Sequence, residues 1–257
     1  MAGGIGRVVV GAALALLANA GAATAQGALA PHTAQPERPT VATHAGTVAP
    51  GWIEVESGVE RDQAPSRITS LQTPTLLKFG VASRVQFDVM VEVVQPASGT
   101  TAGFGDAAVA VKWRLLDHAP LVGNFAVEPG LKLPTGSATR GTGTTDASLL
   151  LISSHVLGPV ALDINVGYTG TSASGDTANA MLWTVSTGTT IDGPWAIAAE
   201  LFGHPGFGAR GSAGFLAGPT WTVRPWIVLD AGFIAKVAGN QPSALYAGIT
   251  WNIGRLW

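Results

Sequence analysis

Hydrophobic and polar residues alternate with a period of two along most of this chain, which is the pattern of β-strands. In one such stretch Val85, Phe87 and Val89 share one face, while Arg84 and Asp88 share the other. The alternation predicts strands at residues 52–60, 74–82, 84–94, 105–115, 122–133, 146–156, 160–169, 180–190, 195–202, 212–222, 226–236 and 244–257. None of these segments is convincingly helical in period, so we expect an all-β protein.

The connections between the predicted strands alternate in length. Longer loops rich in glycine and polar residues, such as 134–146, follow the odd-numbered strands, and short turns, such as 157–159, follow the even-numbered strands. An even number of strands of about ten residues, with the long loops at one end, is typical of outer-membrane barrels. We therefore expect residues 51–257 to form a transmembrane, antiparallel, up-and-down β-barrel of about twelve strands. A secreted β-sandwich is the alternative, because it also sorts its residues onto two faces.

The charged residues of the predicted strands share the less apolar of the two faces. The lumen-lining candidates are Glu54, Glu56, Lys78, Arg84, Asp88, Glu92, Asp106, Lys112, Arg114, Glu128, Lys132, Asp163 and Glu200, with Glu60, Asp230 and Lys236 on the same face. In a barrel the uncharged face contacts lipid and the charged face lines the lumen. Two interpretations remain open, namely a narrow pore whose charges select solutes and a salt-bridged network that only satisfies the interior.

Aromatic residues also fit a membrane barrel. Trp113, Trp195, Trp221 and Trp257 fall near the short turns and on the apolar face, as in the aromatic girdle at a membrane interface. The last predicted strand ends the chain on an aromatic residue, which resembles the C-terminal signal by which the barrel-assembly machinery recognises outer-membrane proteins. The expected partners are therefore outer-membrane lipid, small-molecule solutes and that machinery.

Residues before the first predicted strand divide into two parts. Residues 1–25 combine Arg7, an apolar run and the sequence Ala23-Thr24-Ala25, which indicates a secretory signal peptide. Residues 26–50 are rich in proline and lack periodicity, so we expect an exposed, extended segment that is too short to fold as a plug domain.

Composition excludes several functions. The chain is 47% hydrophobic and 12% charged, with a net charge of −2 and no cysteine. These values give no basic surface for nucleic acid, no disulfide framework and no lipoprotein attachment site. The predicted signal peptide and barrel together make the bacterial outer membrane the expected location.

Three features with possible chemistry have simpler explanations. Ser153, Ser154 and His155 lie together, but their order differs from that of outer-membrane phospholipases. The histidines lack the spacing of metal ligands, and the G-x-G-x-x-G match at 206–211 lacks the following helix of a dinucleotide site. We expect no catalytic residue, no metal and no cofactor.

Two motifs carry a resemblance to a known family. Gly103-Phe104-Gly105-Asp106 opens one predicted strand, and the segment from Pro129 to Pro134-Thr135-Gly136 ends the next. Both are similar to motifs of the MetA-pathway of phenol degradation family, and the similarity extends over most of residues 52–257. The resemblance implies an outer-membrane barrel that passes small, aromatic or hydrophobic compounds.

The expected function is accordingly passive passage of small solutes across the outer membrane. A structural barrel, or one that binds partners through its loops, is the alternative. An outer-membrane hydrolase is a weaker alternative, because no nucleophile motif is present.

Overall fold

The computed structural model describes residues 30–63, 69–96, 99–137, 139–172, 179–205 and 211–257. The expected signal peptide at residues 1–25 and most of the glycine motif, residues 206–210, lie outside the described residues. The described ranges contain no helix that is long and apolar enough to cross a membrane.

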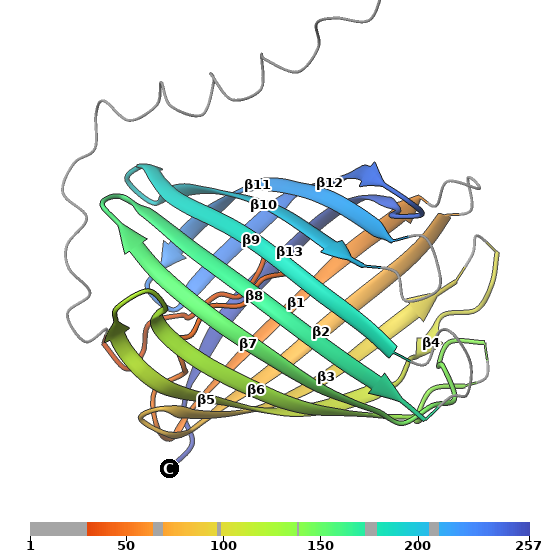
Figure 1. Cartoon of the computed structure of the whole chain (residues 1–257), viewed down its shortest axis with the longest axis horizontal. Coiled ribbons are helices and arrows are strands. Elements are labelled where there is room, and N and C mark those ends of the chain that lie inside the picture. The colour runs from red at the N-terminus through yellow and green to blue at the C-terminus, as the bar shows by residue number, and fades with distance from the viewer. Residues whose placement is uncertain (1–29, 64–68, 97–98, 138, 173–178, 206–210) are drawn as a thin grey trace, which may run out of the picture.

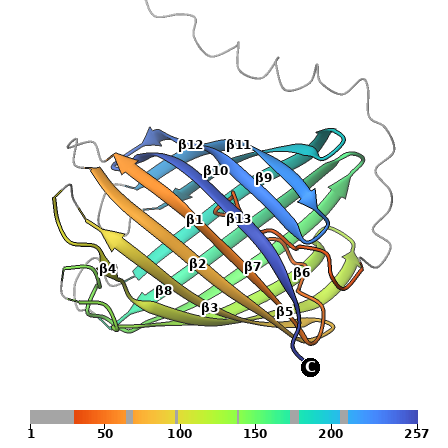
Figure 2. The same cartoon turned by 180° about the vertical axis from the view of Figure 1, so that it is seen from behind.

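The described residues form a closed antiparallel β-barrel, as the alternation predicts (Figures 1 and 2). Its strands are β1 (Trp52–Gln63), β2 (Thr69–Ala82), β3 (Val85–Gln95), β5 (Ala107–Ala119), β6 (Gly123–Leu133), β7 (Asp146–Leu157), β8 (Val160–Thr171), β9 (Asn179–Asp192), β10 (Trp195–His204), β11 (Ser212–Arg224), β12 (Ile227–Ala238) and β13 (Ser243–Arg255). Each strand pairs with the next, and β1 pairs with β13, so the sheet has no free edge. A two-residue strand, β4 (Gly103–Phe104), adds to the end of β3.

Strand bounds agree closely with the predicted ranges, and the largest difference is in β2. The prediction starts this strand at Pro74, whereas β2 begins at Thr69 and Pro74 lies opposite Glu92 of β3. The ladder between β1 and β2 skips the position of Pro74, because proline has no N–H to donate. The strand continues past the proline since its pairs with β3 are kept.

The two faces of the sheet differ as predicted. Outward-facing apolar residues such as Val111, Val166 and Leu201 are 39%, 43% and 47% exposed. Lumen-facing Lys78 and Lys112 are fully buried despite their charge. Trp113, Trp195 and Trp221 are exposed on the outside, and Trp257 is exposed just past the end of β13. Trp195 and Trp221 stack with ring centroids 5.5 Å apart. The apolar exterior is thus suited to lipid.

The N-terminal segment, residues 30–50, lies inside the barrel, and the expectation of an exposed segment is wrong. It enters at the end that carries the C-terminus and the short turns, and it appears as a red-orange trace within the lumen (Figure 1). Ala42, Ala45 and Val48 are 2%, 0% and 0% exposed. Its small and proline-rich residues form extended backbone that fits between the walls.

Candidate functional site

Wall side chains accept hydrogen bonds from the backbone of the N-terminal segment. Glu54 and Glu56 of β1 accept from the N–H groups of Gln35, Glu37 and Arg38, and Glu200 of β10 accepts from those of Val41 and Ala42. Asn165 of β8, Ser154 of β7 and Gln86 of β3 accept from Thr43, Ala45 and Val48. The segment therefore contacts strands all around the barrel. Three of the predicted lumen-lining residues, Glu54, Glu56 and Glu200, accept hydrogen bonds from its backbone.

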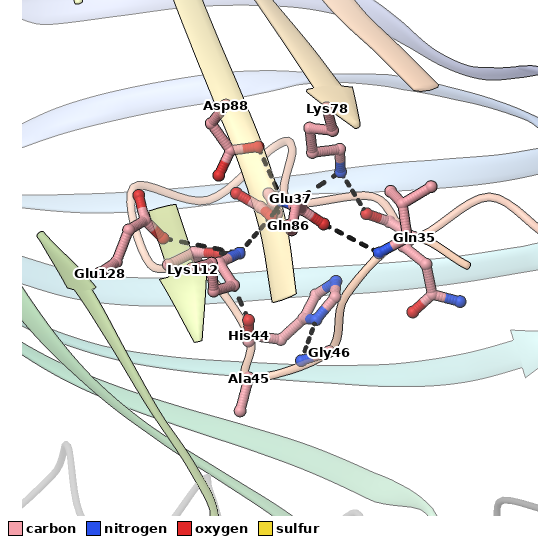
Figure 3. A network of polar contacts seen from close by, with 12 residues as sticks. Gln35, Glu37, His44, Ala45, Gly46, Lys78, Gln86, Asp88, Lys112 and Glu128 are labelled. Carbon is pink, nitrogen blue, oxygen red and sulfur yellow. Dashed lines mark hydrogen bonds and ion pairs between the residues drawn. The ribbon is translucent and has the colours of Figure 1, made fainter. Parts of the chain in front are cut away.

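Two buried lysines of the wall are joined through one carboxylate of the segment (Figure 3). Lys78 Nζ lies 2.6 Å from Glu54, 2.5 Å from Glu56 and 3.8 Å from Glu37. Lys112 Nζ contacts Glu37 and donates to Thr43 Oγ1 at 2.7 Å. Both ammonium groups are removed from water, so each requires these anionic partners. Here the charges form a salt-bridged network, one of the two interpretations of the sequence pattern.

Arg38 connects the segment to β12. Its Nε and Nη2 each donate to a carboxylate oxygen of Asp230 at 3.1 Å. Gly58 of β1 and Gly248 of β13 are paired across the sheet, and a Cβ at either would lie within 2.7 Å of the guanidinium. These glycines leave the space in which the arginine rests against the wall.

Two predicted lumen residues lie instead at the short-turn end. Arg84 precedes β3 in the turn, its side chain is 47% exposed, and it pairs with Asp117. Arg114 also pairs with Asp117, at 2.9 Å. The parity of both arginines is as expected, but their depth is not, because parity gives the face of a residue and not its distance from the strand end.

Asp106 and Lys132 lie at the opposite, long-loop end. Asp106 accepts from the N–H groups of Gly136 and Thr142, both of which belong to the 134–145 loop, and from Lys132 at 3.3 Å. Lys132 also pairs with Asp146 at 2.9 Å. The Thr142 and Gly136 hydrogen bonds, aided by Lys132, hold the pKa of Asp106 well below its usual range. The two sequence motifs that carry the family resemblance are thus in direct contact through Asp106 and Gly136.

The remaining predicted residues face the lumen at intermediate depth. Asp88 accepts from Gln86 at 2.9 Å, Asp163 accepts from Ser154, and Glu128 lies 3.7 Å from Lys112. Glu92 is half-buried beside Gly105.

A cavity of about 320 Å³ lies beside the middle of the segment. Residues Glu37, Arg38, Thr40, Val41, Ala42 and Thr43 form one side, and Pro74, Leu76, Met90 and Glu92 of β2 and β3, together with Glu56 and Asp106, form the rest. The lumen is therefore not filled completely by the segment.

The serine and histidine residues do not form a catalytic triad. Ser153 Oγ lies 3.0 Å from His155 Nε2, but it donates its only proton to the carbonyl oxygen of Val122. His155 Nε2 must then donate to the serine and so does not act as its base. Asp163 binds Ser154 instead of His155.

No group of three or more histidine, aspartate or glutamate residues within the described ranges has a metal-binding arrangement. His32 instead lies between Trp52 and Trp226, with ring centroids 4.8 Å from each, and contacts the carbonyl oxygen of Asn252 at 2.9 Å. This contact fixes the start of the segment at the short-turn end.

Sequence reasoning missed the role of the segment in the lumen. One signal was present, since Pro31, Pro36 and Pro39 enforce extended backbone whose other N–H groups need acceptors. A second was the excess of carboxylates on the inner face of the predicted strands, which need donors. The N–H groups of the segment supply the donors, and the carboxylates of the strands supply the acceptors.

Solved structures share this fold. An outer membrane channel from Pseudomonas putida F1 matches with a TM-score of 0.61 and 13% identity, over 80% of this chain and 97% of that chain. The KdgM porin matches with a TM-score of 0.55 and 11% identity, over 77% and 98%. At these identities the likeness shows the fold of an outer-membrane barrel and nothing finer. No curated protein matches the sequence.

The sequence model of one family matches residues 37–252, from the lumenal segment to the last strand. That range includes Glu37, both motifs at Asp106 and Gly136, and Asp230. The match confirms the resemblance seen in the sequence, and the chain belongs to the family described as the MetA-pathway of phenol degradation.

Proposed function

We propose that this protein is an outer-membrane channel for passive passage of small solutes, with residues 30–50 as its constriction. One observation carries the proposal: the barrel encloses a polar lumen that its own segment narrows but leaves with a cavity of about 320 Å³. A purely structural barrel has no need of such a space. The family and the channels of the same fold support this function, and the passage of aromatic or hydrophobic compounds is the finer part of the proposal.

The membrane placement follows from the exterior. The outward apolar residues would contact outer-membrane lipid, the short turns would face the periplasm and the long loops the outside. β13 exposes Leu245, Trp251 and Ile253 on its outer face, and the barrel-assembly machinery would recognise this terminal strand. Fractionation with outer membranes and altered gel mobility without heating are the expected results, whereas recovery as a free periplasmic protein would contradict the placement.

Conductance in planar bilayers and swelling of liposomes test the channel. The refolded protein should show small conductance steps and pass small neutral solutes while excluding large ones. The variant Arg38→Ala, which frees the segment from β12, should conduct more. If correctly folded wild type and variant both conduct nothing and pass no solute, the structural or loop-binding barrel becomes the better explanation.

A further inference from the structure

The cavity has one apolar wall, formed by two neighbouring strands. In the register of β2 and β3, Leu76 lies opposite Met90, and Pro74 lies opposite Glu92. Side chains at such cross-strand positions are close enough to contact one ligand together. The next lumen-facing pair toward the short turns is Lys78 and Asp88, at the level of the salt-bridged network. The wall thus changes from charged to apolar at the cavity.

Glu92 differs from the other carboxylates of the cavity. Glu56 is bound by Lys78 and by backbone N–H groups of the segment, and Asp106 is bound by Lys132 and the 134–145 loop. Within the described part of the chain, Glu92 makes no ion pair, and its side chain lies over Gly105 at the edge of the cavity. Its half-buried carboxylate is available to a ligand.

The basic residues near the cavity already form ion pairs within the protein. Arg38 is paired with Asp230, Lys78 with Glu54 and Glu56, and Lys112 with Glu37. Because none of these cations is free, an anionic solute would meet carboxylates without a compensating charge. A cationic solute would be attracted by the same carboxylates.

We propose that this cavity binds a small organic ammonium ion, whose charge lies at Glu92 and whose apolar body lies against Pro74, Leu76 and Met90. This inference rests on the proposed channel function and adds a solute class to it. A volume of about 320 Å³ is at the lower end of small-molecule sites, which suits a single ring or a short chain. The ammonium group donates charge-assisted hydrogen bonds to the carboxylate, and the alkyl or aromatic part is removed from water by the apolar wall.

Three probes of similar size test the proposal, namely benzylamine, benzyl alcohol and benzoate. Calorimetric titration of the refolded full chain in detergent, at neutral pH and low salt, should rank them in that order of affinity. The amine should bind about fivefold more tightly than the alcohol, as expected for one partly exposed charge pair. Equal binding of amine and alcohol, or preference for benzoate, would overturn the inference.

Two variants separate the charge from the apolar wall. Glu92→Gln should reduce amine affinity to that of the alcohol and leave the alcohol unchanged. Met90→Ser should weaken both ligands by a similar factor and keep their ratio. Asp163→Asn is the matched control, because it removes a lumenal carboxylate that does not line the cavity, and it should keep the amine preference. Loss of the preference in this control as well would show that only the general field of the lumen acts.

Different results would contradict the proposed channel function and the proposed binding site. If small polar neutral solutes enter liposomes only when the protein is present but the amine shows no binding preference, the channel stands and the cation site is wrong. If the amine binds through Glu92 but no solute or ion crosses the bilayer, the site stands and the channel is wrong. Unheated gel mobility establishes that each variant is folded before it is measured.

Discussion

Arg38 of the N-terminal segment and Asp230 of β12 form a two-point ion pair, although 192 positions separate them in the sequence. The Asp230 side chain is 2% exposed and that of Arg38 is 16% exposed. A planar guanidinium matches a carboxylate at both oxygens, so the pair fixes direction as well as distance. It holds the middle of the segment against the wall.

Replacing Arg38 by alanine should therefore release this part of the segment. The change leaves the Asp230 carboxylate without its partner, at a cost of at most about 3 kcal/mol because lumenal water replaces the guanidinium. Bilayer conductance should rise, and amide exchange of residues 37–42 should become faster. Arg38→Lys should give an intermediate result, since lysine offers only one contact point.

A double-mutant cycle identifies the cause of that change. Asp230→Asn alone should also raise conductance, and the double variant should add little to either single one. Additive effects of the two substitutions would mean that the residues act independently, contrary to the observed contact.

The acceptor on β10 gives a second test of how the segment is held. Glu200 accepts from the N–H groups of Val41 and Ala42 at 2.7 and 2.8 Å. Glu200→Ala removes both acceptors and should accelerate amide exchange at these positions, with a local loss of about 2 to 4 kcal/mol. Glu200→Gln keeps one acceptor oxygen and should lose about half as much. Equal exchange in wild type and the alanine variant would show that the segment does not depend on this contact.

The barrel was predictable because its cause is local and repeated. A period of two, interrupted by turns, specifies which face of each strand is buried, so the positions of Lys78 and Lys112 follow from parity. The barrel must close because the bilayer tolerates no unpaired edge. The start of β2 was predicted wrongly at Pro74. A proline can lie within a strand where the hydrogen-bond ladder on one side is interrupted.

The contents of the lumen were less predictable. Contacts such as Glu37 with Lys112 join positions 75 residues apart, and no periodicity relates them. Parity placed Arg84 on the correct face, but its pairing with Asp117 at the barrel end depends on exact strand ends. The open volume beside the segment depends on side-chain packing, which a pattern of residue types does not specify.

Neighbouring positions on the paired strands β3 and β5 test the assignment of the two faces. Val111 is 39% exposed on the outside, and Lys112 is buried in the lumen. Val111→Arg should destabilise the inserted barrel by about 2 to 4 kcal/mol if it lies near the bilayer centre. Asp88→Asn, which faces the lumen and keeps an acceptor for Gln86, should cost much less. Equal losses in urea unfolding from vesicles would contradict the faces.

The stacking of His32 between Trp52 and Trp226 gives a prediction for the start of the segment. His32→Ala loses both ring contacts and the contact with Asn252, with a local cost of about 2 kcal/mol. His32→Phe keeps the stacking and should lose only about 1 kcal/mol. Amide exchange of residues 33–38 measures both effects. A phenylalanine variant as labile as the alanine variant would assign the effect to the hydrogen bond alone.

Asp106 makes the order of the 134–145 loop dependent on pH. The hydrogen bonds from Thr142 and Gly136 require the carboxylate, and they lower its pKa below the value of about 3.9 for a free aspartate. Since the folded pKa is the lower one, the stabilisation is fully present above that value and is lost as the pH falls through the folded pKa. Protection of the Gly136 and Thr142 amides should therefore remain constant from pH 7 to about pH 5 and decrease only in stronger acid.

The variant Asp106→Asn distinguishes the titration of this carboxylate from effects of its neighbours Lys132 and Asp146. An asparagine keeps one acceptor oxygen but no charge, so protection of the two amides should be lower at neutral pH and nearly independent of pH in acid. Asp192→Asn, at the end of β9 beside the short turn to β10, is the control and should leave the loop unchanged. If the acid-induced loss persists in the Asp106 variant, the titrating group is Asp146, which binds the same lysine at 2.9 Å.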